Sequence, residues 1–288
     1  MGSTPTTPTS LPVRWVPPGL TIARRANRLL GGRWPGLAAR IARRGFLVPR
    51  RLPEREWELA GLDSALSERF LPGLHGLRWP AEGPKVLCLH GWEGRASHFV
   101  SLAGHLQGRG FEVLSLDGPA HGRSAGRLAH PWAFADALLA VDAVHGPFHA
   151  VIGHSMGASS VLYARSLGLR VERIVSLAAP LRASEVLQRF MDLMELNELV
   201  RERFVALVES MVGQPQTLLD LERLAPHLEV PGLVVHGTAD PDVPWEDAPR
   251  LAAAWPEAEL LLLEGLGHRR ILREGVVLER VSAFLEGA

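Results

Sequence analysis

Ala150-Val151-Ile152-Gly153-His154-Ser155-Met156-Gly157-Ala158 is the stretch that decides the fold, because an apolar run leads directly into a serine between small residues. The pattern predicts a buried strand, a tight turn and the start of a helix. The turn residue adopts a strained backbone, so its neighbours must be small. The serine hydroxyl would then lie exposed at the positive end of a helix. A simple helix cap at Ser155 would not require glycine on both sides.

Outward from this turn, short apolar runs alternate with amphipathic stretches, which is typical of a layered α/β fold. The predicted strands are Arg69–Leu71, Leu74–Trp79, Lys85–Leu89, Glu112–Leu116, Phe148–Ile152, Glu172–Leu177, Gly232–His236 and Glu259–Leu263. The first two predict an antiparallel start, and most later connections can hold a crossover helix. The predicted helices between and after the strands are Ser97–Gln107, Pro131–Val144, Met156–Leu167, Trp245–Ala254 and Val276–Leu285.

One connection is much longer than a crossover helix needs, at about fifty residues after Leu177. It predicts two or three helices, over Ala183–Leu196, Glu198–Val212 and Thr217–Leu224, that form a lid over the strand ends. Flexible apolar side chains in this lid are candidates for lining an acyl or alkyl pocket. The four candidate substrate contacts are Phe190, Met191, Met194 and Met211, and for any single one simple packing between helices is the alternative.

Composition excludes several classes of protein. The chain has 288 residues, 47% of them hydrophobic, and 31 basic residues balance 31 acidic ones. This argues against disorder and against nucleic-acid binding, which needs excess cationic residues. No apolar run reaches the ~18 residues of a membrane span. A single cysteine excludes a disulfide scaffold, and residues 1–12 lack the apolar core of a secretory signal, so we expect a cytoplasmic protein.

A nucleophilic serine needs a base and an orienting acid. Among twelve histidines, His268 follows the last predicted strand in a glycine-rich loop, at the edge of the sheet where ligands bind. Asp240 follows the strand before it and is the preferred acid. Asp242 is its rival, with a turn or helix-capping role as the alternative. The chain order is then Ser155, Asp240, His268.

A tetrahedral intermediate needs backbone N–H donors where negative charge develops. Met156, directly after the serine, supplies one at the start of the helix. Trp92 is the candidate for the second, because its loop leaves the strand ending at Leu89 and the neighbouring Gly91 allows close approach. Trp92 is also bulky, which favours a small to medium ester over a long triglyceride. For His90 we favour a structural role in pinning this loop.

Five motifs in this order resemble the α/β-hydrolase superfamily, in its serine hydrolase and esterase branch. They are His-Gly-Trp-Glu-Gly at 90–94, Asp-Gly-Pro-Ala-His-Gly-Arg-Ser at 117–124, Gly-His-Ser-Met-Gly at 153–157, Gly-Thr-Ala-Asp-Pro-Asp-Val-Pro at 237–244 and Gly-Leu-Gly-His-Arg-Arg-Ile-Leu at 265–272. The resemblance implies a mostly parallel eight-stranded sheet flanked by helices, with a small helical lid. It also implies that Ser155, Asp240 and His268 form a triad, with Trp92 and Met156 as the oxyanion hole. Within the superfamily the chain is similar to small bacterial hydrolases of unassigned substrate.

The resulting prediction is a serine carboxylesterase that works through an acyl-enzyme. Acyl transfer, thioester cleavage or a lyase reaction on the same fold is the alternative, and a non-catalytic, membrane-associated binding protein is the other. We expect no cofactor, because no glycine-rich dinucleotide motif follows the first strands, and no metal, because no histidine–carboxylate spacing suits one. The predicted division is residues 61–180 and 229–288 for the hydrolase core and residues 181–228 for the lid.

Residues 1–60 are predicted to form a basic N-terminal arm. Residues 1–53 contain ten arginines and no acid, so the remainder carries 21 basic residues against 31 acidic ones. Apolar residues recur at helical spacing among these arginines, and Gly31-Gly32 and Pro35 limit the arm to two short helices. Packing of the arm on the hydrolase body is the interpretation that we favour. Peripheral contact of residues 20–51 with an anionic membrane is the alternative.

Overall fold

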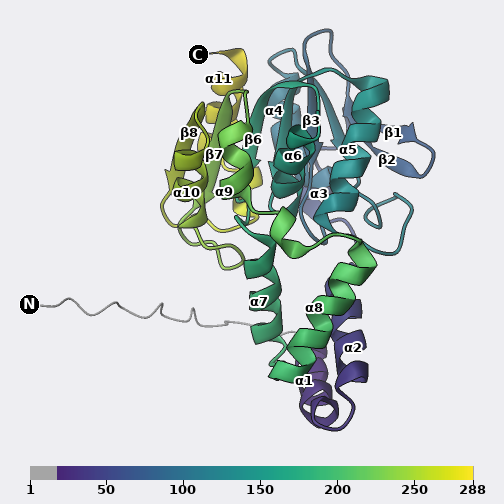
Figure 1. Ribbon diagram of the computed structural model, residues 1–288. Helices are drawn as coiled ribbons and strands as arrows, with labels where there is room; N and C mark the ends of the chain where they lie inside the picture. Colours follow the sequence, from purple (N-terminus) through teal and green to yellow (C-terminus); the bar gives the residue numbers. More distant parts are fainter. Residues whose placement is uncertain (1–17, 288) are drawn as a thin grey trace, which may run out of the picture.

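One eight-stranded sheet forms the centre of the computed structural model, which describes residues 18–287 (Figure 1). The strands lie in the order β1-β2-β4-β3-β5-β6-β7-β8. Only β2 runs against its neighbours, β1 and β4, and all other pairs are parallel. This confirms the predicted fold class. The strands are β1 Leu66–Leu71, β2 Leu74–Trp79, β3 Lys85–Leu89, β4 Glu112–Leu116, β5 Phe148–His154, β6 Val171–Leu177, β7 Gly232–Gly237 and β8 Ala258–Leu263.

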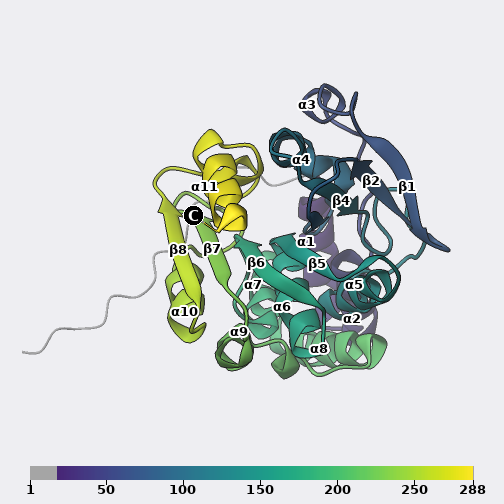
Figure 2. The ribbon, with the colours of Figure 1, turned by 90° about the horizontal axis from the view of Figure 1, so that it is seen from above.

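Both faces of the sheet are covered, as the continuously apolar strands require. In β3, Val86 and Cys88 face one apolar core, and Leu87 and Leu89 face the other. The first core lies between the sheet and helices α4 and α11, and the second lies between the sheet and helices α5, α6 and α10. Figure 2 shows these two sets of helices on opposite sides of the sheet. These helices are α4 Val100–Gln107, α5 Pro131–His145, α6 Met156–Ser166, α10 Asp247–Ala254 and α11 Gly275–Glu286.

Several predicted elements differ at their ends. The strand predicted to stop at Ile152 continues to His154, because Gly153 and His154 still pair with the last residues of β6. The helix predicted over Ser97–Gln107 begins as a 3-10 turn, η1, at Ala96–Phe99 and continues as α4. The third helix of the insertion shortens to fragments. The remaining short elements are α3 Glu56–Leu59, η2 Gln216–Leu218, α9 Leu221–Leu224, η3 Ala225–His227 and η4 Arg270–Leu272.

Four helices form a separate layer that projects from one end of the sheet (Figure 1). Two come from the arm and two from the long insertion: α1 Pro18–Gly31, α2 Pro35–Leu47, α7 Ala183–Leu193 and α8 Glu198–Val212. Three buried alanines of α2 pack in one apolar cluster with three buried residues of α8, and small side chains let the two helices approach closely. The members of this contact are Ala38, Ala39, Ala42, Val200, Phe204 and Val208. The N-terminal arm therefore packs on the insertion.

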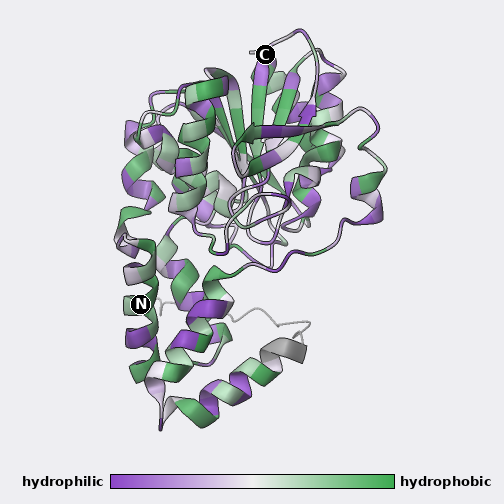
Figure 3. Cartoon of the chain, turned by 90° about the vertical axis from the view of Figure 1, so that its right-hand side faces the viewer, coloured by the Kyte–Doolittle hydropathy of each residue, from purple (hydrophilic) through white to green (hydrophobic). Residues whose placement is uncertain are grey.

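The first arm helix is tied to the turn between α7 and α8 by polar contacts. Arg28 pairs with Glu195, and Arg24 Nε donates to the carbonyl oxygen of Leu193. Hydrophilic and hydrophobic residues alternate along the four helices (Figure 3), and part of the apolar stripe of the arm stays exposed. Its exposed members are Ile22, Leu29, Trp34, Leu37 and Ile41. Membrane contact through residues 20–51 stays a prediction.

Across residues 18–287, no helix combines the length and the apolar character that a membrane crossing requires. The Ser/Thr/Pro-rich segment 1–12, which we expect not to be a secretory signal, lies outside the described residues.

Candidate active site

Ser155 lies in the sharp turn between β5 and α6 that its flanking residues predict. Its φ is +54° and its ψ −125°, a left-handed backbone that L-residues rarely adopt. The flanking glycines are required by close approach. A Cβ on Gly153 would lie 2.4 Å from Cα of Ala158, and a Cβ on Gly157 would lie 2.4 Å from the carbonyl oxygen of His90. The serine is therefore held in a strained, closely packed turn, as expected for an exposed nucleophile.

The loops after β7 and β8 bring together an acid and a base. Nδ1 of His268 lies 2.7 Å from Oδ2 of Asp240, and both side chains are buried. The other oxygen, Oδ1, accepts the backbone N–H groups of Asp242 at 2.8 Å and Val243 at 2.9 Å. An ionised Asp240 accepts a hydrogen bond from Nδ1–H of His268, which leaves Nε2 as the basic nitrogen of the imidazole.

A second histidine, His236, also contacts Asp240. Its Nε2 lies 3.1 Å from Oδ2, and the side chain is fully buried. Burial works to raise the pKa of Asp240, yet the hydrogen bonds from His236 and His268 outweigh it and hold that pKa well below its usual range. Sequence reasoning placed His236 in the sheet and missed this contact. The only signal was its place at the end of a strand, four residues before Asp240.

Asp242 lies outside the hydrogen-bonded pair that Asp240 forms with His268. Its side chain is exposed, and its backbone N–H donates to Asp240. Asp240, Asp242 and His268 each offer one potential metal ligand atom, and these atoms lie within 4.8 Å of one another. A metal ion there would have to displace the Nδ1–H proton that joins His268 to Asp240. The donor set therefore fits the hydrogen-bonded pair better than a metal site.

His154 connects the serine turn to the loop of His268. Its Nε2 lies 2.9 Å from the carbonyl oxygen of His268, and the two imidazole rings are 4.6 Å apart. Burial lowers the pKa of His154 well below its ordinary value, and the neighbouring His268 adds to this effect. The ring is therefore neutral, and its Nε2–H donates to the carbonyl. Because His154 immediately precedes Ser155, this bond fixes the base loop relative to the nucleophile.

The loop after β3 runs along the serine. A Cβ on Gly91 would lie 2.7 Å from Cβ of Ser155 and 3.3 Å from its Oγ. Between residues 18 and 287, the backbone N–H groups of Trp92 and Met156 donate to no acceptor, which leaves both available to an anion. His90 pins the loop as predicted, since its Nε2 accepts the N–H of Gly118 at 2.9 Å and its Nδ1 lies 2.7 Å from the oxygen of Gly91.

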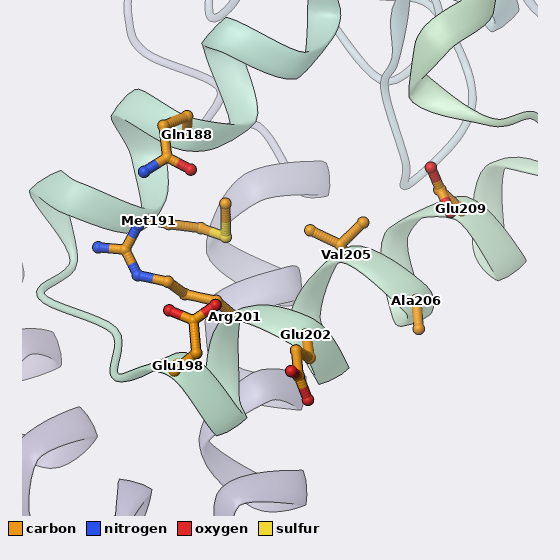
Figure 4. Close-up of a pocket in the computed structure, with 8 residues that line it drawn as sticks. All are labelled: Gln188, Met191, Glu198, Arg201, Glu202, Val205, Ala206 and Glu209. Atoms are coloured by element: carbon orange, nitrogen blue, oxygen red, sulfur yellow. The ribbon is translucent and has the colours of Figure 1, made fainter.

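The four candidate substrate contacts lie in the helical layer. Phe190 packs between Phe46 of the arm and Phe204 of α8, with ring centroids 4.9 and 5.4 Å away. Met191 and Met194 are buried in the same cluster, and Met211 is 42% exposed. Met191 also lines a cavity of about 580 Å³ between α7 and α8, where Glu198 and Glu202 add carboxylates (Figure 4). Their role as substrate contacts stays a prediction.

Buried neutral histidines make stability depend on pH. Burial lowers the pKa of both His90 and His154 well below 6.5. As pH falls below 6.5, these two imidazoles therefore bind protons in the unfolded chain but stay neutral in the folded one. Their contribution is present above about pH 6.5 and is lost as pH falls, by about 3 kcal/mol for the pair between pH 7.5 and 5.5. Urea unfolding at the two pH values measures this loss. A His227→Gln control, on a histidine outside these buried positions, should keep the full pH dependence, whereas an equal free energy of unfolding at both values would contradict the prediction.

Comparison with known proteins defines the class that this fold and site represent. A model described as the alpha/beta hydrolase family matches residues 86–280, and the chain belongs to that family. By its description, this is a family of hydrolases.

A "Serine hydrolase-like protein" of Danio rerio is 32% identical over 123 residues, which is 39% of this chain and 37% of that protein. The match thus spans little more than a third of the relative. An esterase of Pyrococcus furiosus superposes with a TM-score of 0.61 at 20% identity, over 84% of this chain and 97% of that one. Alpha/beta hydrolase domain-containing protein 10 from mouse gives 0.58 at 15% identity, over 78% and 97%. At these identities the two structures show the shared fold alone.

Proposed function

We propose that this protein is a serine hydrolase that cleaves a carboxylic ester through an acyl-enzyme intermediate. One observation carries the proposal: a serine in a strained strand-to-helix turn follows His154, which bonds to the backbone of His268, and His268 is hydrogen-bonded, at 2.7 Å, to a buried aspartate. A serine at its ordinary pKa is a weak nucleophile, and this pair supplies the base and the group that orients it. We place the enzyme in the cytoplasm as part of the same proposal.

In the proposed mechanism, Oγ of Ser155 attacks the ester carbonyl while Nε2 of His268 takes its proton. Asp240 holds the imidazole and stabilises the imidazolium that forms. The N–H groups of Trp92 and Met156 bind the oxyanion of the tetrahedral intermediate. His268 then gives its proton to the leaving alcohol. Water, activated by the same imidazole, attacks the acyl-enzyme and releases the acid and the free serine.

The experiment that tests this function is turnover of para-nitrophenyl esters from short to long acyl chains, with an acyl thioester in parallel. We expect hydrolysis of short and medium esters, and turnover of thioesters alone would favour a thioesterase instead. An added alcohol acceptor distinguishes acyl transfer, which would form a new ester in place of the free acid. If no ester or thioester reacts and Ser155 takes up no fluorophosphonate, a non-catalytic binding protein becomes the better interpretation.

The N-terminal arm supports the proposed oxyanion loop through Arg50. Its Nε and Nη2 donate to the two carboxylate oxygens of Glu93 at 2.7 and 2.6 Å. Glu93 follows Trp92, has a left-handed φ of +54°, and donates its own N–H to Nε2 of His121 at 3.0 Å. A bidentate pair of this kind fixes geometry as well as charge. We infer that Arg50 positions the loop that carries the N–H of Trp92.

Arg50→Ala should therefore lower kcat by about tenfold, because small displacements of a donor weaken binding of the transition state. Arg50→Lys should recover part of this loss, since lysine keeps the charge but cannot form the fork. Arg40→Ala removes an exposed arginine of α2 and is the matched control, with no expected change. Ester hydrolysis at saturating substrate measures all three. An Arg50→Ala enzyme with the kcat of the Arg40→Ala control would rule out the positioning role.

A further inference from the structure

A cavity of about 410 Å³ opens beside His268, and its lining is strongly basic. It is formed where the segment before β1 meets the loops after β7 and β8. The residues that matter for its chemistry are Arg55, Trp57, Asp242, His268, Arg269 and Arg273. Arg270 also lines it but pairs with Glu274 at 3.3 Å, so its charge is partly compensated.

Three of the cavity's guanidinium groups have no carboxylate partner. Between residues 18 and 287, no acidic group forms an ion pair with Arg55, Arg269 or Arg273. Asp242, the one acid in the lining, faces His268 and Asp240, with ligand atoms within 4.8 Å. The cavity thus carries an excess of positive charge, with four arginines in its lining against the carboxylate of Asp242 and the ion pair of Arg270 with Glu274. This is typical of a site for an anionic ligand group.

The arginines are also positioned. The guanidinium of Arg273 lies 5.0 Å from the ring centre of Trp57, a cation–π contact that holds its flexible side chain. Burial lowers the pKa of His98 to about 4 against the opposing charge of Glu58, and Arg269 and Arg55 lower it further. The charges of two arginines far apart in the sequence thus act on the same imidazole. That imidazole packs against Trp57 at 6.0 Å, and Trp57 lines the cavity together with both arginines.

The position of the cavity indicates which part of a substrate reaches it. His268 lines the cavity, whereas Ser155 does not. In ester cleavage the imidazole that gives its proton to the leaving alcohol must face that alcohol. A substrate portion that extends past His268 therefore belongs to the leaving group and not to the acyl chain.

We propose that this cavity binds an anionic group, a carboxylate or a phosphate, on the alcohol portion of the substrate. The inference rests on the proposed ester hydrolysis and adds the chemical class of the leaving group. Arg269 and Arg273 supply the principal contacts, and Arg55 adds a third positive charge to the lining. Binding energy from this remote group orients the scissile ester.

The test uses three butyrate esters that share one acyl group: para-carboxyphenyl butyrate, para-phosphonooxyphenyl butyrate and the neutral methyl ester of the first. The measured quantity is the ratio of kcat/KM for each anionic ester to that for the neutral ester. In an Arg269→Gln/Arg273→Gln enzyme we expect this ratio to fall roughly tenfold from its wild-type value. Arg223→Gln removes an exposed arginine of α9, outside the cavity, and should leave the ratio unchanged. The carboxylate and the phosphate arms show which anion is preferred.

A second measurement needs no variant of the cavity. In the wild-type enzyme, added sodium chloride should raise KM for the anionic esters and leave KM for the neutral ester unchanged, because exposed charges are screened by salt. Equal ratios in the wild-type and double-variant enzymes, or equal salt dependence for all three esters, would overturn the inference while leaving ester hydrolysis intact. Failure of the wild-type enzyme on the neutral ester would instead overturn the proposed function.

Discussion

Ser155→Ala is expected to lower kcat for ester hydrolysis by a factor of roughly 10⁴ to 10⁶, because the covalent route disappears with the nucleophile. The variant should still fold. Alanine tolerates the backbone that the turn demands, since Ala178 and Ala120 already adopt positive φ values of 51° and 66° in this chain. The backbone N–H of residue 155 can also keep its bond to the carbonyl oxygen of Leu177, which is 2.8 Å long in the wild type.

The matched control is Ser166→Ala, which removes an exposed hydroxyl from the other end of α6. Its Oγ bonds only to the carbonyl oxygen of Tyr163, so the control should keep full activity. Circular dichroism and the urea midpoint of both variants establish that each is folded. An Ser155→Ala enzyme with the turnover of the Ser166→Ala control would show that the serine is not the nucleophile.

Asp240→Asn is expected to lower kcat by roughly 10³- to 10⁴-fold, because it forces the imidazole of His268 into the wrong tautomer. The N–H groups of Asp242 and Val243 both donate to Oδ1, so an asparagine must place its carbonyl oxygen there. Its NH₂ group then faces His268, which has to accept at Nδ1 and carry its proton on Nε2. An imidazole protonated on Nε2 cannot take the proton of Ser155.

Asp242→Asn tests which of the two candidate aspartates, Asp240 or Asp242, is the acid that orients His268. The side chain of Asp242 is exposed, and its hydrogen bond to Asp240 comes from the backbone N–H, so we expect kcat within a few-fold of the wild type. The same para-nitrophenyl ester assay serves both variants. A loss in Asp242→Asn as large as in Asp240→Asn, or a nearly unchanged Asp240→Asn enzyme, would contradict the assignment of the acid.

Local patterns predicted the sheet well because they reflect local physics. Continuous apolar runs mark strands that are buried on both faces, as in β3. The strands β2, β3 and β4 begin and end at the predicted residues. The turn at Ser155 was predictable because its glycines meet a steric requirement that lies within five residues. The pairing of Asp240 with His268 followed from their places after neighbouring strands, since parallel strands end at the same edge of a sheet.

The sequence could not predict which residues of the fold the arm, His236 and the cavity arginines would contact. The arm carries an apolar stripe that requires a partner, but periodicity does not say whether the sheet body or α8 supplies it. The contact of His236 with Asp240 depends on how the loop folds back after β7, and no spacing rule encodes this. Nor could the sequence show that Arg55 and Arg269 line one cavity, because they lie more than two hundred residues apart in the chain.

The most direct test of the central claim, an acyl-enzyme formed on Ser155, is mass spectrometry of the intact protein after reaction with a fluorophosphonate, followed by peptide mapping. The proposal predicts one label per chain, located on Ser155, absent from Ser155→Ala and formed much more slowly in Asp240→Asn. A folded wild-type protein that takes up no label, or one whose label lies on another residue, would contradict it.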